Sequence, residues 1–238
     1  YKGYVSSNRL YSWSDVTPTT NVSLSDFRSY AKARGTGFQV IDFQQHCVIA
    51  MMLYAKYKTR NLQGVLGPGG AGSSPVATTG SSNATGGVDT KNESSKYVCG
   101  LGLEGVFGGI CEWVEGVEIN NRVWKITDPD GSTRNVNAET FSGWIINIAA
   151  ENGPFFDVVP TQVGGSDSTH YSDYYSRTSD SSLVLARSGY RSYPTGGVAY
   201  TDAAYDASDM DSSYGSRLAF HGTISELAPR QFKRLPVL

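Results

Sequence analysis

Apolar residues recur at helical spacing in two early parts of the chain. In the first, Ser23 stands three residues before Asp26, which is typical of a helix N-terminus, and an apolar face follows until Gly35 ends the pattern. The second run, 42–58, is apolar on most sides, so its helix is expected to be buried on most sides. The pattern therefore predicts two helices near the start of the chain.

After residue 97 the pattern changes to short alternating runs. Val117 and Ile119 flank Glu118, as in a half-buried strand, and 123–127 is expected to be the next strand. Trp113 is interpreted as a buried anchor of the core. Two helices, short strands and long connections predict an α+β domain with a small antiparallel sheet and long loops.

Segment 64–95 consists largely of Gly, Ser, Thr, Asn and Pro. Because it lacks the apolar residues needed for a core of its own, it is expected to be a long surface loop inserted into the domain. Its GPGGAG stretch lacks the Lys-Ser/Thr that follows in a phosphate-binding loop. We therefore assign no phosphate site to it.

The length and net charge of the chain limit the kinds of partner that it is expected to bind. A chain of 238 residues can bury one sizeable core, and a net charge of −2 gives no basic field for nucleic acid. No apolar run approaches the roughly 20 residues that span a bilayer, so no membrane insertion is expected. Residues 1–22 are interpreted as an extended segment or the end of a missing upstream region, and 225–238 as a C-terminal tail.

The cysteines do not form a disulfide framework, because there are only three of them. Cys47 is interpreted as a small buried hydrophobic residue. Cys99 and Cys111 flank a glycine-rich turn, and a disulfide between them is the less favoured alternative. No cysteine or histidine has metal-ligand spacing to another, so we predict no metal and no cofactor.

Tyrosine is concentrated late in the chain, with eight of the fifteen tyrosines between Tyr171 and Tyr214. A buried phenol needs a hydrogen-bond partner, which makes such a segment poor core material. Tyrosine mixed with Ser, Gly and Asp is typical of antibody combining sites. The composition therefore predicts a binding surface that is open to solvent and whose side chains can be exchanged at little cost.

Three stretches resemble motifs of one family. Residues 102–121 read GLEGVFGGICEWVEGVEINN, similar to the G-x-E-N-x-x-G-N-V-W-E-W-V-D-G signature of C-type-lectin-like domains of the formylglycine-generating-enzyme type. Residues 185–220 contain LARSGY, GGVAY and YGSRLAF, similar to the closing R-G-G-S-W and G-x-R-L segment of these domains. Residues 59–67 read TRNLQGVLG, similar to the T-R-N-x-Q stretch of one branch, the variable proteins of diversity-generating retroelements.

The resemblance implies a C-type-lectin-like fold over 23–224 with a variable binding segment at 187–217. Members of that branch are often phage tail-fibre receptor-binding proteins or bacterial surface proteins. A protein or glycan receptor on a cell surface is therefore the expected partner, and the likeness to phage fibres suggests a homotrimer. The candidate ligand-binding positions carried over from the variable segment are Tyr190, Ser192, Tyr193, Thr195, Tyr200, Asp202, Tyr205, Asp206, Ser208, Asp209, Asp211 and Ser213.

The same resemblance assigns five further positions to the constant scaffold pattern of the family: Gly189, Gly197, Gly215, Arg217 and Leu218. One position departs from it, because Arg187-Ser188-Gly189 stands where the family has Arg-Gly-Gly. The departure concerns the local backbone at Ser188.

An enzyme of the same family is the first alternative. Its oxidising members use cysteines near the C-terminal end, whereas this chain has none after Cys111. Glu112 and Glu115 are paired carboxylates, but they belong to the scaffold motif and are interpreted as structural. The three histidines show none of the clustered spacing of an iron site: His46, His170 and His221. We therefore predict a protein without catalytic residues.

Two binding or structural alternatives remain. A calcium-dependent lectin could use the oxygens of the aspartates in segment 202–211, but the Glu-Pro-Asn, Gln-Pro-Asp and Trp-Asn-Asp sugar motifs are missing. A fibre or assembly domain would bury the tyrosine-rich face between subunits. The prediction we favour is ligand or receptor binding through that face.

Overall fold

The computed structural model describes residues 1–69, 76–89, 97–128, 130–149, 156–178, 182–189 and 196–223. Within these ranges the helices are α1 (Leu24–Lys32), α2 (Phe43–Tyr57), α3 (Leu62–Leu66) and a 3₁₀ turn at Asn83–Thr85. None of the helices in these ranges is long and apolar enough to cross a membrane.

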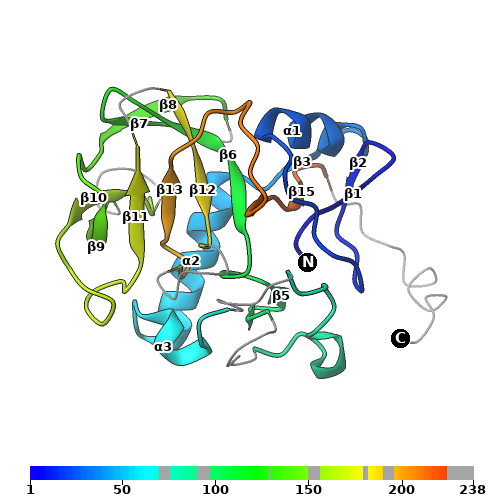
Figure 1. The fold of residues 1–238 in the computed structure, drawn as a ribbon, viewed down its shortest axis with the longest axis horizontal. Helices are drawn as coiled ribbons and strands as arrows, with labels where there is room; N and C mark the ends of the chain where they lie inside the picture. The colour runs from blue at the N-terminus through cyan, green and yellow to red at the C-terminus, as the bar shows by residue number, and fades with distance from the viewer. Residues whose placement is uncertain are drawn as a thin grey trace.

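A large curled sheet, shaped like a half-barrel, dominates the described part of the chain (Figure 1). Its nine strands are β6 (Cys111–Asn120), β7 (Val123–Thr127), β8 (Thr133–Asn137), β9 (Gly143–Ile148), β10 (Pro160–Val163), β11 (Tyr174–Arg177), β12 (Leu183–Arg187), β13 (Thr201–Ala203) and β14 (Tyr214–Gly215). The spatial order is β10-β9-β11-β13-β12-β6-β7-β8, and β14 pairs with β6. The β11–β13 and β14–β6 pairs are parallel, so the sheet is mixed.

Three two-stranded pairs complete the described strands: β1 (Tyr4–Ser6) with β2 (Arg9–Tyr11), β3 (Phe38–Val40) with β15 (Leu218–Phe220), and β4 (Cys99–Gly100) with β5 (Leu103–Glu104). The β1–β2 hairpin and the β3–β15 pair lie beside α1 (Figure 1).

The predicted fold class is therefore wrong. The chain is mostly β with one large mixed sheet, rather than an α+β C-type-lectin-like domain with a small antiparallel sheet and long loops. All residues of β12 and β13 are buried, and a strand covered on both faces shows no alternation of apolar and polar residues. The described part of segment 147–181 holds β10 and β11.

The two early helices were predicted correctly in position. Ser23 Oγ accepts a hydrogen bond from Asp26 N at 3.0 Å, as its place before α1 suggested. Asp42 and Gln45 form a capping box that begins α2. The expected burial of α2 on most sides was wrong, because the helix packs on the sheet with one face and exposes the other face, which carries Val48, Met51 and Met52.

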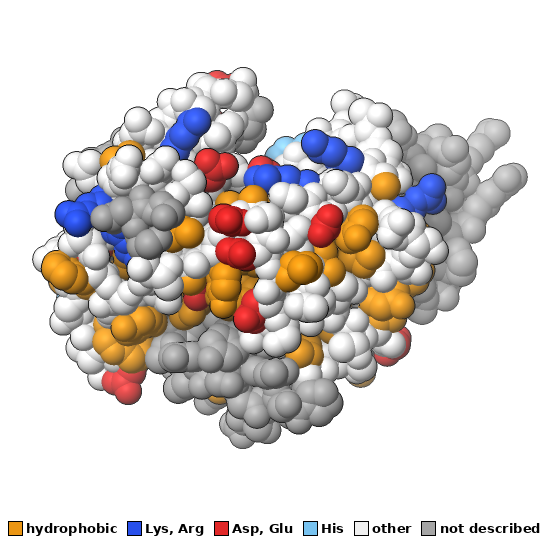
Figure 2. Space-filling model, turned by 45° about the horizontal axis from the view of Figure 1, so that its top comes forward, with side chains coloured by type: hydrophobic (Ala, Val, Ile, Leu, Met, Phe, Trp, Pro, Cys, Tyr) orange, Lys and Arg blue, Asp and Glu red, His pale blue; other side chains and the backbone are white. Residues whose placement is uncertain are grey.

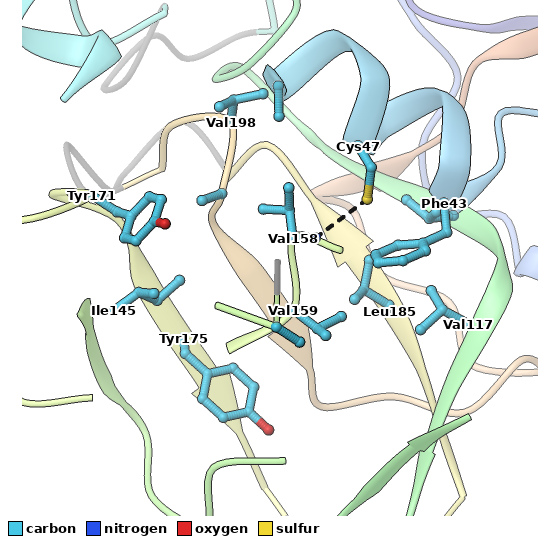
Figure 3. Close-up of a cluster of buried hydrophobic side chains, with 14 of the residues drawn as sticks. Phe43, Cys47, Val117, Ile145, Val158, Val159, Tyr171, Tyr175, Leu185 and Val198 are labelled. Carbon is cyan, nitrogen blue, oxygen red and sulfur yellow. Dashed lines mark hydrogen bonds between the residues drawn. The ribbon is translucent and has the colours of Figure 1, made fainter. Parts of the chain in front are cut away.

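The larger of the two core clusters among the described residues lies between α2 and the sheet (Figure 3). Phe43 and Cys47 of α2 contact this cluster, to which β11 contributes Tyr175 and β12 contributes Leu185. Val158 N donates a hydrogen bond to Cys47 Sγ, and burial raises the pKa of this thiol to about 12. Cys47 is thus the buried hydrophobic residue that the sequence predicted.

The second cluster covers the other face of the same strands. Trp113 of β6 and Val184 of β12 point into it, and Leu24 and Phe27 of α1 close it. Cys111 is also buried here, and both Cys111 and Cys99 are free thiols, so the disulfide alternative was wrong. The middle of the sheet is therefore a shared wall between two cores.

Hydrogen bonds to buried groups hold the described part of segment 64–95 against the rest of the domain. The buried Glu104 carboxylate accepts hydrogen bonds from Gly80 N and Ser82 N, each at 2.8 Å. Thr79 N donates to Val16 O at 2.9 Å. Glu104 thus supplies acceptors for backbone groups that the segment cannot pair within itself.

Candidate ligand-binding site

The candidate segment leaves the sheet at β12 and returns at β13. Between them Gly189 and Gly196 touch, because a Cβ added to Gly189 would lie 2.3 Å from the Cα of Gly196. Gly189 also has a φ of +62°, which favours glycine. The chain therefore comes into close contact with itself at Gly189 and Gly196. Four predicted site residues lie outside the described residues: Tyr190, Ser192, Tyr193 and Thr195.

Arg187 fastens the returning chain to the sheet. Its buried guanidinium donates to the carbonyl oxygens of Ala199 and Val158 and to Thr201 Oγ1. The next residue, Ser188, has a φ of +79°. Serine thus adopts here a left-handed backbone conformation, which favours glycine.

Asp173 holds the same turn from the other side. Its buried carboxylate accepts hydrogen bonds from Gly197 N at 2.6 Å, Ala199 N at 2.8 Å and Gln63 Nε2 at 3.0 Å. Burial raises the pKa of Asp173 to about 7, against the lowering effect of these donors. Asp173 was not among the predicted site residues, because nothing near it in the sequence links it to residues 197–199.

We expect Asp173→Asn to lower the free energy of unfolding by about 1–3 kcal/mol. The amide oxygen can still accept from one of the two backbone N–H groups, but the amide NH2 faces the other and leaves it without an acceptor. Urea unfolding measures this loss. Asp167→Asn is the matched control, since this side chain is exposed, and should change stability by less than about 0.5 kcal/mol. Equal stability of the two variants would contradict the role given to Asp173.

A hollow of about 260 Å³ lies in the surface next to the turn at residues 197–199. Tyr174 and Ser176 of β11 form one wall, and residues of β13, β14 and the intervening turn form the rest. Five predicted site residues line it: Tyr200, Asp202, Tyr205, Asp211 and Ser213. Figure 2 shows several acidic side chains near the middle of one face of the molecule, with hydrophobic side chains beside them and basic side chains nearby.

Four residues that were not among the predicted site residues also line the hollow: Tyr174, Ser176, Ala204 and Tyr214. Tyr174 and Tyr214 belong to the same concentration of tyrosines that drew attention to the segment, so composition could have pointed to them. Tyr174 lies outside 187–217 and reaches the site through the parallel pairing of β11 with β13.

The expectation of a uniformly exposed, exchangeable segment was wrong in part. Asp206, Ser208 and Asp209 are exposed, whereas Tyr200 and Asp202 are 3% and 7% exposed. Residues 201–203 form β13, which neighbouring strands flank on both sides. Tyr200 and Asp202 therefore form the floor of the hollow, and the exposed residues lie on the turn that follows.

Tyr205 and Tyr214 form an aromatic corner over Trp113. Their ring centroids are 5.0 Å apart at an interplanar angle of 74°, and the Trp113 ring lies 4.6 Å from Tyr214 and 6.1 Å from Tyr205. Trp113 Nε1 donates to Val22 O at 3.0 Å, which fixes the indole. The corner thus has a rigid support from the second core.

Two carboxylates lie in this aromatic setting. Tyr200 donates its phenolic proton to Asp202 Oδ2 at 3.2 Å, and Tyr205 donates to Asp211 Oδ2 at 3.4 Å. Burial raises the pKa of Asp202 above its ordinary value. Asp202 Oδ1 is buried and accepts no hydrogen bond from any described residue.

The paired carboxylates considered above as candidates for catalysis make structural contacts instead. Glu112 is buried against Lys2, Arg217 and His46, and Glu115 pairs with Arg28. In the part of the chain that the structure describes, no three His, Cys, Asp or Glu side chains gather as a metal site would require. Asp206 and Asp209 instead accept hydrogen bonds within their own turn.

Comparison of the chain with models of protein families and with curated proteins finds no match. The case for a function therefore depends on the geometry of the hollow formed by Tyr174, Ser176, Tyr200, Asp202, Ala204, Tyr205, Asp211, Ser213 and Tyr214.

Proposed function

We propose that this protein binds a receptor without catalysing a reaction, and that the tyrosine-lined hollow with its exposed 206–209 rim is the combining site. The observation that carries the proposal is the rigid aromatic corner of Tyr205 and Tyr214 beside Asp202 and Asp211. Aromatic anchors held over a packed core carry much of the energy in many recognition sites, while polar neighbours adjust specificity.

The resemblance to variable proteins of diversity-generating retroelements adds the biological setting to the proposal. In that setting the ligand is a protein or glycan on a cell surface, and the protein acts in a phage tail fibre or on a bacterial surface. The burial of Tyr200 and Asp202 restricts variation without loss of stability to the exposed rim, including Asp206, Ser208 and Asp209.

Filling the hollow tests this function. Ser176 is half-buried and lines the wall of the hollow. Ser176→Trp therefore places an indole in the space that a ligand would occupy. We expect labelled wild-type protein to bind some members of a panel of intact bacterial cells, and Ser176→Trp to lower that binding at least tenfold. Flow cytometry measures the bound protein.

Asn135→Trp is the matched control. Asn135 is exposed on β8, which lies at one end of the sheet, with β12, β6 and β7 between it and β13. The same large side chain there should leave cell binding unchanged, and circular dichroism should show both variants folded. Binding that survives Ser176→Trp, or that both substitutions abolish equally, would contradict the assignment of the hollow.

A further inference from the structure

The charged residues that line the hollow are both acidic. Asp202 and Asp211 contribute carboxylates, and none of the described lining residues is a lysine, arginine or histidine. The pairing of β11 with β13 directs Tyr174 and Ser176 toward the hollow, whereas Tyr175 of β11 points into the core beneath the sheet. The two charged side chains that an anionic ligand would meet among these lining residues are therefore both negative.

Asp202 is incompletely paired. A buried carboxylate oxygen without a donor is unfavourable, and Oδ1 of this 7% exposed residue has none among the described residues. Oδ1 is itself buried, so the carboxylate must rotate about its Cβ–Cγ bond, a broad torsion, for this oxygen to face the hollow. A ligand that brings N–H donors would supply the missing hydrogen bond.

The aromatic rings add a second attraction for the same kind of ligand. Tyr205 and Tyr214 both line the hollow, and their rings meet at an interplanar angle of 74°. A cation over a tyrosine face gains about 0.5–1 kcal/mol at an exposed site and about 2 kcal/mol when desolvated. At about 260 Å³ the space is just below the usual range of small-molecule sites, about 300–1,000 Å³, and suits one side-chain head group.

We propose that this hollow takes a compact organic cation, such as the guanidinium or ammonium group of a basic side chain on the receptor. The cation lies against Tyr205 and Tyr214 and donates hydrogen bonds to Asp202 and Asp211. This ligand chemistry rests on the proposed function, since it concerns the same combining site. The carboxylates of Asp202 and Asp211 would favour approach of a basic group on the receptor.

Small probes separate charge from shape. We expect N-acetyl-argininamide to bind the intact chain in the millimolar range, detected as shifts of amide NMR signals, and N-acetyl-citrullinamide, its uncharged isostere, to bind at least tenfold more weakly. N-acetyl-lysinamide and choline distinguish basic side chains from quaternary ammonium groups, and both support the proposal if they bind better than citrullinamide. Equal binding of the citrulline probe, or tighter binding of a neutral methyl glycoside, would overturn it.

Near-isosteric variants locate the effect. Asp202→Asn should weaken binding of N-acetyl-argininamide at least tenfold, and Asp211→Asn gives an independent test if the first variant does not fold. Asp167→Asn is the control, because this exposed carboxylate belongs neither to the hollow nor to its 206–209 rim. Unchanged affinity in both folded hollow variants would overturn the proposal.

Failure of this inference is distinguishable from failure of the proposed function. If Ser176→Trp abolishes cell binding but N-acetyl-argininamide does not bind the wild type, the combining site stands and its cationic preference is wrong. If the probe binds in the hollow but Ser176→Trp leaves cell binding intact, the cation site stands and the receptor-binding role of the hollow is wrong.

Discussion

Trp113→Ala should lower the free energy of unfolding by about 3–5 kcal/mol, the usual cost of removing a large buried aromatic side chain. Trp113 is 1% exposed in the second core, donates to Val22 O at 3.0 Å and supports Tyr205 and Tyr214 from below. Chemical denaturation followed by circular dichroism measures the loss. Because the aromatic corner loses its support, receptor binding should also weaken in molecules that remain folded.

Trp13→Ala is the matched control for Trp113. Trp13 is 45% exposed and stacks on Tyr11 at a centroid distance of 4.2 Å, so its removal should cost less than about 1.5 kcal/mol. Similar losses in the two variants would show that Trp113 is not the anchor of the second core.

The second large effect is expected at Glu112, the centre of a buried ionic cluster. Its Oε1 lies 3.0 Å from Lys2 Nζ and 2.9 Å from Arg217 Nη2, and its Oε2 lies 3.4 Å from His46 Nε2. Arg217 also donates to the carbonyl oxygens of Glu104 and Gly105. The cluster thus joins the N-terminal segment, α2, β6 and the end of the candidate segment.

Glu112→Gln should destabilise the fold by about 3–5 kcal/mol, because Lys2 and Arg217 would remain buried without their counter-charge. Glu115→Gln is an unusually close control on the same strand. Glu115 pairs with Arg28 at the edge of solvent, with about 30% of each side chain exposed, and such pairs are worth at most about 1 kcal/mol. Equal losses measured by urea unfolding would contradict the assigned role of the Glu112 cluster.

The same cluster predicts a dependence on acid. Burial alone would raise the pKa of Glu112, but Arg217 and Lys2 hold it well below its ordinary value. A carboxyl group with a depressed pKa stabilises the fold above the unfolded pKa of about 4.3, and this contribution is lost as the pH falls through the folded value. The difference in stability between wild type and Glu112→Gln should therefore shrink in strong acid.

Local features of the fold could be predicted because neighbouring residues encode them. Ser23 with Asp26 and Asp42 with Gln45 start helices through contacts three residues apart, and the alternation around Glu118 predicted part of β6. The extent of the sheet could not be predicted in this way. β12 and β13 are buried on both faces, so their sequences lack the period of two that identifies a strand.

The candidate site was likewise predictable from the sequence only in part. Tyrosine enrichment and the resemblance directed attention to 187–217, and Tyr200, Asp202, Tyr205, Asp211 and Ser213 of that segment line the hollow. The sequence could not predict that Tyr200 and Asp202 are buried, because that depends on strands β11 and β12 on either side of β13. Nor could it place Tyr174 there, since Tyr174 reaches the site through strand pairing.

By itself the sequence determined the helix starts, the buried character of Trp113 and Cys47, and the aromatic and acidic composition of the late segment, since these depend on residue type and short spacing. Tertiary structure alone decided which phenols line the hollow, why Asp202 keeps an unpaired oxygen, and how Glu112 collects its basic partners. Those features join residues up to 110 positions apart, such as Lys2 and Glu112, and chain folding rather than local pattern brings such residues into contact.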